Sequence, residues 1–340
     1  MKPRSFAALA RLLQAGSGLV IGPDKTYLLE TRLAPILKRH SLRDLDALAD
    51  RVRPDGSGAL ERRVIEAMTT NESFFFRDDK PFVHFRTQAL PRLHAARVAG
   101  ARLRIWSAAA SAGQEAYSLA MILAECGASL NGRGFEIVGT DISGEQVERA
   151  RAALYTQFEV QRGLPIQYLV KYFRKEDCNW RITDPIRSAV AFREWNLLTD
   201  LRPLGRFDIV FCRNVLIYFD QPTKRRALEA IAGQMMPDGL LYLGGAETVL
   251  GITDRFAAIP GEHGGSIGRR QRQRRPFVSP RLRQGLRWQR PADYGAHPSA
   301  RNSPTTASAG TSRWVKARPI PRTSTNVSCP SRVFLSRRMC

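Results

Sequence analysis

The feature that most constrains the fold is an alternation of short apolar runs with amphipathic stretches across residues 102–250. The apolar runs lie at residues 103–106, 135–139, 190–192, 207–211 and 240–243. Helical periodicity follows several of them, at residues 114–126, 144–154 and 221–236. This order predicts an α/β fold, with a mostly parallel sheet covered by helices on both faces. Residues 160–189 interrupt the alternation and predict a small inserted subdomain.

The first part of the chain has a different pattern. Apolar residues recur there at helical spacing, without strand-like alternation, at Phe6, Leu9, Leu12, Leu13, Leu28, Leu29, Leu33, Ile36 and Leu37. Glycine- and proline-containing turns separate the helical stretches. We therefore expect a small all-α domain at residues 1–80. The α/β domain would follow at residues 81–263, with the inserted subdomain at about residues 160–192.

The formal net charge of +22 is unevenly distributed. Residues 264–340 carry +16 of it and are rich in Arg, Pro and Ser, which leaves +6 for the first 263 residues. Such a segment buries too little apolar surface to offset its ordering entropy, so we expect a disordered basic tail. Two explanations stay open: a genuine tail, and an out-of-frame read that would deprive the sheet of its last strand. A nucleic-acid-binding function is disfavoured, because the charge lies in the tail.

Composition excludes several other classes. No apolar run reaches the roughly 18–20 residues that span a bilayer. The apolar N-terminal stretch is broken by Arg11 and lacks a cleavage site, which indicates a helix and not a signal peptide. The five cysteines form no CxxC pair, so we expect no metal site and a reducing, cytoplasmic location.

Two motifs suggest nucleoside binding. The run Ser107-Ala-Ala-Ala-Ser-Ala-Gly-Gln-Glu-Ala-Tyr-Ser118 joins a strand to a helix, and its small residues would let a ligand approach the backbone. Asp141 follows the next strand and is placed to accept hydrogen bonds from both ribose hydroxyls. Taken alone, the first motif is equally an ordinary strand-to-helix turn, and Asp141 equally a helix cap. Their combination favours nucleoside binding.

Two further runs mix aromatic and polar residues. In Met68-Thr-Thr-Asn-Glu-Ser-Phe-Phe-Phe-Arg-Asp78, the phenylalanines predict core packing, and the polar residues among them need partners that a ligand can supply. The run Phe211-Cys-Arg-Asn-Val-Leu-Ile-Tyr-Phe-Asp220 follows a strand, at the sheet edge where ligands bind in open α/β folds. By composition alone it is equally a strand and turn.

Together these runs make the sequence resemble the chemotaxis receptor protein-glutamate O-methyltransferase family, the CheR type. The resemblance rests on the four runs, on Thr140-Asp-Ile-Ser, Asn196-Leu-Leu and Pro237-Asp-Gly-Leu-Leu, and on their order across residues 5–263. It implies a Rossmann-like methyltransferase domain that binds S-adenosylmethionine, preceded by the all-α domain. It also implies a monomer that methylates glutamates on the cytoplasmic helices of chemotaxis receptors.

The resemblance also implies site residues. Glu115 would hold the amino-acid end of S-adenosylmethionine and Asp141 its ribose. The other cofactor-binding positions would be Asn71, Ser73 and Arg77 around the sulfonium, Asn196 and Leu197 near the adenine, and Asn214 and Val215 along the pocket wall. Arg77 and Tyr218 would lie nearest the transferred methyl group. They would position the reactants and transfer no proton, because a glutamate carboxylate is already ionised at neutral pH.

Receptor recognition would fall to the helical domain, where Arg32, Lys38 and Arg39 share one predicted helix. An ordinary solvated helix face explains these charges equally well. In some family members a glycine-containing loop of the inserted subdomain binds a receptor's C-terminal peptide. The corresponding run from Phe173 to Ile182 is short and lacks glycine, so we expect no such tether.

The sequence departs from the family at the first motif, where Gln114 and Ala116 replace the usual Glu and Pro. We expect this change to weaken cofactor binding slightly. It also supports an alternative from another class, a catalytically silent signalling or receptor-binding module on the same fold. A methyltransferase with a small-molecule substrate is a further alternative, which the basic helical domain and the family-specific runs disfavour.

Overall fold

A computed structural model describes residues 1–53, 56, 58–98, 100–130, 132, 134–259 and 266–269. The expectation of a disordered or out-of-frame tail concerns residues 264–340, and all of these except 266–269 lie outside the described residues. Within the described part, no helix is long and apolar enough to cross a membrane.

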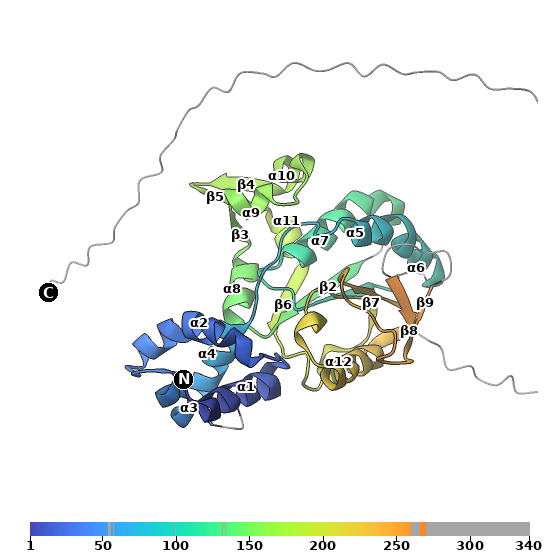
Figure 1. Ribbon diagram of the computed structural model, residues 1–340. Helices are drawn as coiled ribbons and strands as arrows, with labels where there is room; N and C mark the ends of the chain where they lie inside the picture. The colour runs from blue at the N-terminus through green and yellow to red at the C-terminus, as the bar shows by residue number, and fades with distance from the viewer. Residues whose placement is uncertain are drawn as a thin grey trace, which may run out of the picture. The chain divides into compact units, whose positions relative to one another are not determined.

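The N-terminal domain consists of helices, as predicted. It contains α1 (Pro3–Ser17), α2 (Thr26–Arg39), α3 (Leu45–Arg51), α4 (Ala59–Met68) and the 3-10 turn η1 (Pro23–Lys25). Their apolar stripes meet in one core that includes Leu9, Leu13, Leu29, Leu33, Leu48 and Val64. Figure 1 shows these helices together at the blue end of the chain.

A seven-stranded sheet forms the centre of the second domain, in the order β6-β2-β1-β7-β8-β10-β9. Its strands are β1 (Leu103–Ala108), β2 (Phe135–Asp141), β6 (Val190–Glu194), β7 (Phe207–Cys212), β8 (Met235–Leu243), β9 (Phe256–Ala258) and β10 (Ser266–Arg269). The first five pair in parallel, and β10 pairs antiparallel with both β8 and β9. The predicted strands and their mostly parallel arrangement are confirmed.

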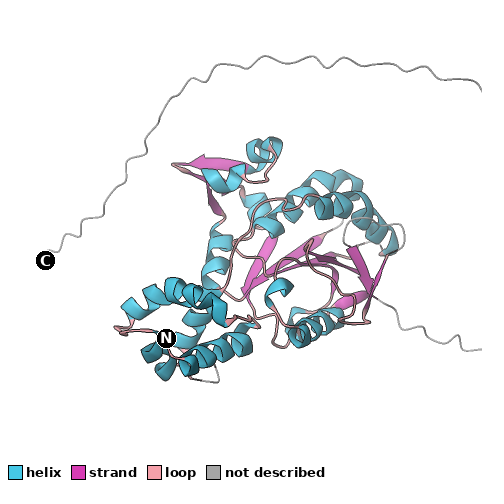
Figure 2. Ribbon diagram, in the orientation of Figure 1, coloured by secondary structure: helices cyan, strands magenta, loops and turns pink. Residues whose placement is uncertain are grey.

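Helices cover both faces of this sheet, as Figure 2 shows. One face packs against α5 (Lys80–His84), the π-helical turn η2 (Phe85–Ala89), α6 (Leu90–Ala96), α7 (Gln114–Cys126) and α8 (Gly144–Ala152). The other face packs against α12 (Gln221–Gly233) and the 3-10 turns η4 (Arg202–Leu204) and η5 (Leu216–Tyr218). The remaining short elements are η3 (Gly127–Leu130) and α11 (Asp184–Arg187).

A second sheet forms the inserted subdomain. Its strands β3 (Leu154–Thr156), β5 (Asn179–Ile182) and β4 (Phe173–Glu176) are antiparallel, and α9 (Gln157–Gln161) and α10 (Ile166–Tyr172) complete the unit. The subdomain was expected from about residue 160, and its first strand begins at Leu154. The hairpin between β4 and β5 turns through Asp177 and Cys178, where Asp177 has a φ of 51°.

An out-of-frame tail would have deprived the sheet of its last strand, but the sheet includes β10. Ile267 in β10 aligns with Leu241 in β8 on one side and with Ala258 in β9 on the other. This strand lies beyond the expected domain boundary at residue 263. Sequence pattern missed it because Ser-Ile-Gly-Arg is short and contains one apolar side chain, too few for a period to be recognised.

Candidate functional site

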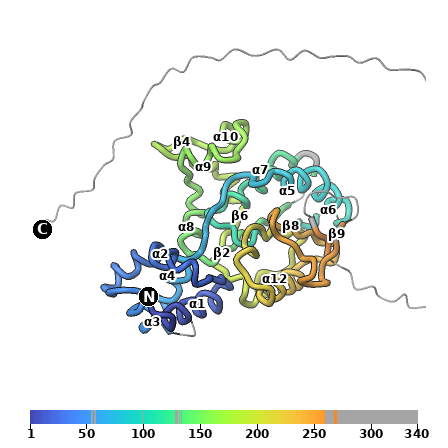
Figure 3. Tube along the Cα trace, in the orientation of Figure 1, coloured from blue at the N-terminus to red at the C-terminus, as the bar shows by residue number. Residues whose placement is uncertain are grey.

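The predicted site residues surround one cavity at the carboxyl ends of β1, β2 and β7. A segment outside the helices and strands, residues 69–79, leads from the helical domain to α5 along this edge of the sheet, and Figure 3 follows its path. All ten residues chosen from the sequence line the cavity: Asn71, Ser73, Arg77, Glu115, Asp141, Asn196, Leu197, Asn214, Val215 and Tyr218. Their individual roles in binding or transfer stay predictions.

Asp141 ends β2 and is buried. One carboxylate oxygen accepts the backbone N–H of Ser111 at 2.8 Å and the other that of Ser143 at 2.9 Å. Burial raises the pKa of Asp141, and these backbone hydrogen bonds oppose that shift. The N-cap of α8 is Ser143, whose hydroxyl accepts the N–H of Gln146, so Asp141 is not the cap of this helix. The backbone N–H of Ile142 also interacts with this carboxylate, which leaves at least one lone-pair site of about four for a ligand.

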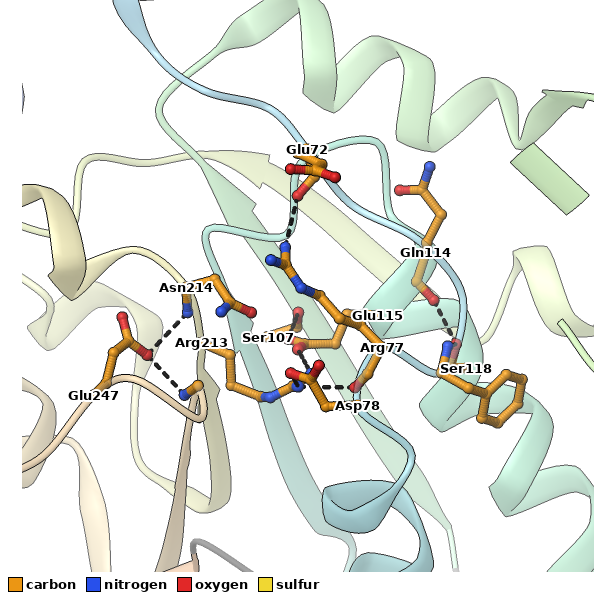
Figure 4. Close-up of polar contacts among 12 residues, drawn as sticks. Glu72, Arg77, Asp78, Ser107, Gln114, Glu115, Ser118, Arg213, Asn214 and Glu247 are labelled. Atoms are coloured by element: carbon orange, nitrogen blue, oxygen red, sulfur yellow. Dashed lines mark hydrogen bonds and ion pairs between the residues drawn. The ribbon is translucent and has the colours of Figure 1, made fainter. Parts of the chain in front are cut away.

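Arg213 connects three parts of the site, although no sequence pattern distinguished it from its neighbours. Its guanidinium pairs with Glu115 at 3.0 Å and with Asp78 at 2.7 Å, and it donates to the carbonyl of Arg77. Only 2% of its side chain is exposed. Glu115 also accepts the hydroxyl of Ser107 at 2.8 Å. Figure 4 shows this cluster beneath Arg77. The carboxylate of Glu115 is therefore held in place before any ligand binds.

The segment that carries Asn71 and Arg77 is tied to the sheet edge. Its Asn71 carbonyl accepts the Ser111 hydroxyl at 2.9 Å. Arg77 donates one N–H to the Glu72 carbonyl at 3.0 Å and lies 5.3 Å from the Phe74 ring centre. The predicted core packing is confirmed for Phe75 and Phe76, whereas Phe74 lines the cavity.

Arg32 holds the start of this segment. Its guanidinium donates to the carbonyls of Met68 and Thr69 and to the hydroxyl of Thr70, over 2.8–3.2 Å. These contacts satisfy carbonyls at the end of α4 and fix the direction in which the chain leaves the helical domain. Lys38 and Arg39 on the same helix are exposed. The three basic residues of the predicted docking face thus differ in their surroundings.

Asn196 and Leu197 enter the cavity from the turn after β6. The side-chain amide of Asn196 donates to the Gly16 carbonyl at 2.6 Å and accepts the Leu198 N–H at 2.9 Å. Asn196 therefore joins the helical domain to the sheet edge, which the sequence did not reveal. The side chains of Trp195 and Leu197 contribute apolar surface to the same wall.

Asn214 and Val215 form the opposite wall, followed by Tyr218 in η5. Their backbone N–H groups both donate to the carboxylate of Glu247 at 2.9 Å. Their contribution to the cavity is therefore limited to carbonyls and side chains. Among the described residues, the hydroxyl of Tyr218 has no hydrogen-bond partner, and it can serve a ligand.

Unusual backbone geometry is concentrated in the loops of this site. Six of the nine described non-glycine residues with positive φ are found there: Phe76, Asp78, Asp79, Ala109, Ser111 and Asn214. Such conformations persist only where the surroundings enforce them, and they gather at functional sites.

Gly113 has a φ of 90°, and a Cβ there would lie 2.9 Å from the Phe192 ring and 3.0 Å from the Ala150 Cβ. This position in the first motif requires glycine.

Gln114, which departs from the family pattern, is buried and does not line the cavity among the described residues. Its neighbour Glu115 does. The substitution therefore leaves the cavity wall unchanged, and the expected small loss of cofactor affinity stays a prediction. No group of described residues could hold a metal ion.

Comparison with known proteins assigns the chain to a family. The CheR methyltransferase all-alpha domain matches residues 4–69, and the CheR methyltransferase SAM-binding domain matches residues 71–264. This chain belongs to the CheR methyltransferase family. It is similar to chemotaxis protein methyltransferase 1 of Pseudomonas aeruginosa, with 41% identity over 75% of this chain and 93% of the relative. Chemotaxis protein methyltransferase Cher2 of Pseudomonas putida is 38% identical over 75% of this chain and 94% of its own.

This CheR-family protein is an S-adenosylmethionine-dependent methyltransferase. The cavity suits that cofactor chemically. It combines the carboxylates of Glu115 and Asp141, which accept hydrogen bonds from amine and hydroxyl groups, with the apolar side chains of Trp195 and Leu197. Two residues that fix the geometry of the cavity, Arg213 and Glu247, were not predicted from the sequence. Arg213 lies within the run Phe211–Asp220, whereas Glu247 lies in no recognised motif.

Proposed function

We propose that this protein transfers the methyl group of S-adenosylmethionine to glutamate side-chain carboxylates of chemotaxis receptors, in the cytoplasm and as a monomer. One observation carries the proposal. The guanidinium of Arg77 and the phenol of Tyr218, both suited to a carboxylate, share a cavity with the two acids suited to the cofactor. The names of the relatives, chemotaxis protein methyltransferases, support the same pathway.

For the cofactor, we assign the ribose to Asp141 and the amino group to Glu115. The ionised Asp141 accepts the ribose hydroxyls through its remaining lone pairs. Glu115, held by Arg213 and Ser107, presents a fixed negative charge to the amino group. Asn196 and Leu197 flank the adenine, whereas Asn71, Ser73, Asn214 and Val215 enclose the methionine portion.

S-adenosylmethionine supplies an activated methyl group with a good leaving group attached. The receptor carboxylate is ionised at neutral pH, so no general base is needed. The protein's part is to align the two reactants and to exclude water, and such alignment is worth about 7–11 kcal/mol in favourable cases. The cavity and the hydrogen-bonded loops around it support this role.

Arg77 and Tyr218 are the residues that we assign to the incoming carboxylate. Arg77 uses one of its five N–H donors on the Glu72 carbonyl, which leaves donors for paired hydrogen bonds to a carboxylate. Tyr218 offers its hydroxyl from the opposite wall. Neither residue needs to transfer a proton.

Receptor docking is assigned to the exposed cations Lys38 and Arg39 of α2. Chemotaxis receptor helices that carry methylatable glutamates are acidic, and a basic surface attracts them. Arg32 is set apart from this pair, because its guanidinium is engaged with Met68, Thr69 and Thr70.

The test is transfer of labelled methyl groups from S-adenosylmethionine to a cytoplasmic receptor fragment. We expect label on the wild-type fragment and none on a fragment whose methylatable glutamates are replaced by alanine. Equal labelling of both fragments would exclude those glutamates as the acceptors. The alternative of a catalytically silent module is set aside, because the chain is an S-adenosylmethionine-dependent methyltransferase.

A further inference from the structure

One carboxylate outside the cavity holds the loop that forms a cavity wall. Glu247 lies in the turn after β8 and is half-buried. Its Oε1 accepts the N–H groups of Val215 at 2.9 Å and Leu216 at 2.7 Å, and its Oε2 those of Asn214 at 2.9 Å and Gly244 at 2.7 Å. Figure 4 shows Glu247 beside the backbone of Asn214. Because a carboxylate has about four lone-pair sites, this set is complete.

The loop needs such an acceptor. Asn214 has a φ of 59°, a left-handed conformation that few non-glycine residues adopt. Its N–H and the next two, at Val215 and Leu216, converge on Glu247 just as the turn η5 begins. Successive N–H groups that converge in this way form an anion-binding concavity, and each of them needs a partner when buried. Glu247 supplies the negative charge from the turn that follows the neighbouring strand β8.

The loop held by Glu247 carries a site residue at each end. Arg213 precedes it and pairs with Glu115 and Asp78, and Tyr218 follows it. Glu247 itself does not line the cavity among the described residues. We propose that Glu247 is a positioning residue for methyl transfer, which acts by fixing the backbone of residues 214–216. The inference rests on the proposed function for the part played by Tyr218 and for the kinetics measured with a receptor.

Gly244 offers an independent way to disturb the same contacts. A Cβ at this position would lie 2.7 Å from Nδ2 and 2.9 Å from the backbone nitrogen of Asn214, and 2.8 Å from Oε2 of Glu247. Gly244→Ala therefore pushes the loop away from the carboxylate without removing the charge. Glu247→Gln keeps the shape of the side chain but turns an amide group, which cannot accept, toward two of the four donors.

The experiment compares Glu247→Gln and Gly244→Ala with the matched control Glu229→Gln, an exposed glutamate on α12. Hydrogen exchange is followed by mass spectrometry on peptides that cover residues 213–219, without any receptor. In both test variants we expect exchange at residues 214–216 to be at least about tenfold faster, with the rest of the protein unchanged. We also expect kcat to fall about 10- to 100-fold, with a smaller change in the receptor KM. The control should match the wild-type protein.

Three outcomes would overturn the inference. Wild-type exchange at residues 214–216 in both variants would show that Glu247 does not fix the loop. Uniformly faster exchange across the protein would indicate a general role in stability instead. Faster exchange confined to residues 214–216, with an undiminished kcat, would show that the position of this loop does not affect methyl transfer. If Glu247→Gln does not fold, Gly244→Ala provides the same readouts. The exchange measurement needs no receptor, so failure of the wild-type protein to methylate receptors would count against the proposed function alone.

Discussion

Arg213 and Glu115 are joined by an ion pair of 3.0 Å that links the end of β7 to the first turn of α7. The pair lies against the cavity, and the same guanidinium holds Asp78 on the segment that arrives from the helical domain. Three chain segments that are distant in sequence are thus fixed to one another through one buried cation. The geometry of the cavity depends on this connection.

Replacing Arg213 by methionine should destabilise the protein strongly. Removing one partner of a buried pair leaves an uncompensated charge, here on Glu115, and costs about 3 kcal/mol. Arg202→Met is the matched control, because Arg202 pairs with Asp200 at the surface and should cost less than about 1 kcal/mol. Urea denaturation measures both changes. Similar losses for the two variants would contradict the structural importance assigned to Arg213.

Arg77→Ala should abolish turnover, reducing kcat by at least about 100-fold, while the fold stays intact. The reason is loss of the donors that hold the incoming carboxylate. Arg162 provides a control, since it lies 4.4 Å from the same Phe74 ring but outside the cavity lining among the described residues. We expect Arg162→Ala to retain most activity in the label-transfer assay. Near-normal methylation by Arg77→Ala would refute the assignment.

Among the basic residues of α2, Arg32 should affect cofactor binding, and Lys38 and Arg39 should affect receptor binding. Arg32→Ala should raise the Kd for S-adenosylmethionine about tenfold, because the segment after α4 loses charge-assisted hydrogen bonds. Charge reversal at Lys38 and Arg39 should raise the receptor KM and leave that Kd unchanged. Calorimetry and steady-state kinetics distinguish the two effects. An unchanged receptor KM after charge reversal would remove the docking role.

Cofactor affinity should depend on pH through Asp141. Burial raises the pKa of Asp141, so its carboxyl takes up a proton at a higher pH in the folded protein than in the unfolded chain. Ribose hydroxyls favour the ionised form, and protonation therefore competes with binding. The Kd for S-adenosylmethionine should rise as the pH falls toward the raised pKa of Asp141, and Asp141→Asn should flatten this rise. An identical pH profile in both proteins would exclude Asp141 as its cause.

Secondary-structure elements could be predicted from the sequence more completely than contacts between distant segments. The apolar runs ending near Trp106, Gly139 and Phe211 became neighbouring parallel strands, because buried strands need such runs. The same pattern placed Asp141 and Tyr218 at one edge of the sheet, since parallel strands end together. The strands and the sheet edge that holds the site could therefore be predicted from local apolar patterns.

Contacts between distant segments had no local signal. Glu247 lies 33 residues from Asn214, and nothing in its surroundings marks it as the acceptor for that loop. Arg32 was grouped with Lys38 and Arg39 by charge, although it is engaged with the end of α4. Charge in a sequence does not reveal whether a partner is already present in the fold.

The chemical nature of the bond formed tests the central claim most directly. After transfer from labelled S-adenosylmethionine, the receptor fragment is treated with mild alkali and the volatile label is measured. A glutamyl methyl ester releases its methyl group as methanol, so we expect nearly all protein-bound label to become volatile. Label that stays on the protein after alkali would mean methylation at nitrogen or carbon, and would contradict glutamate esterification.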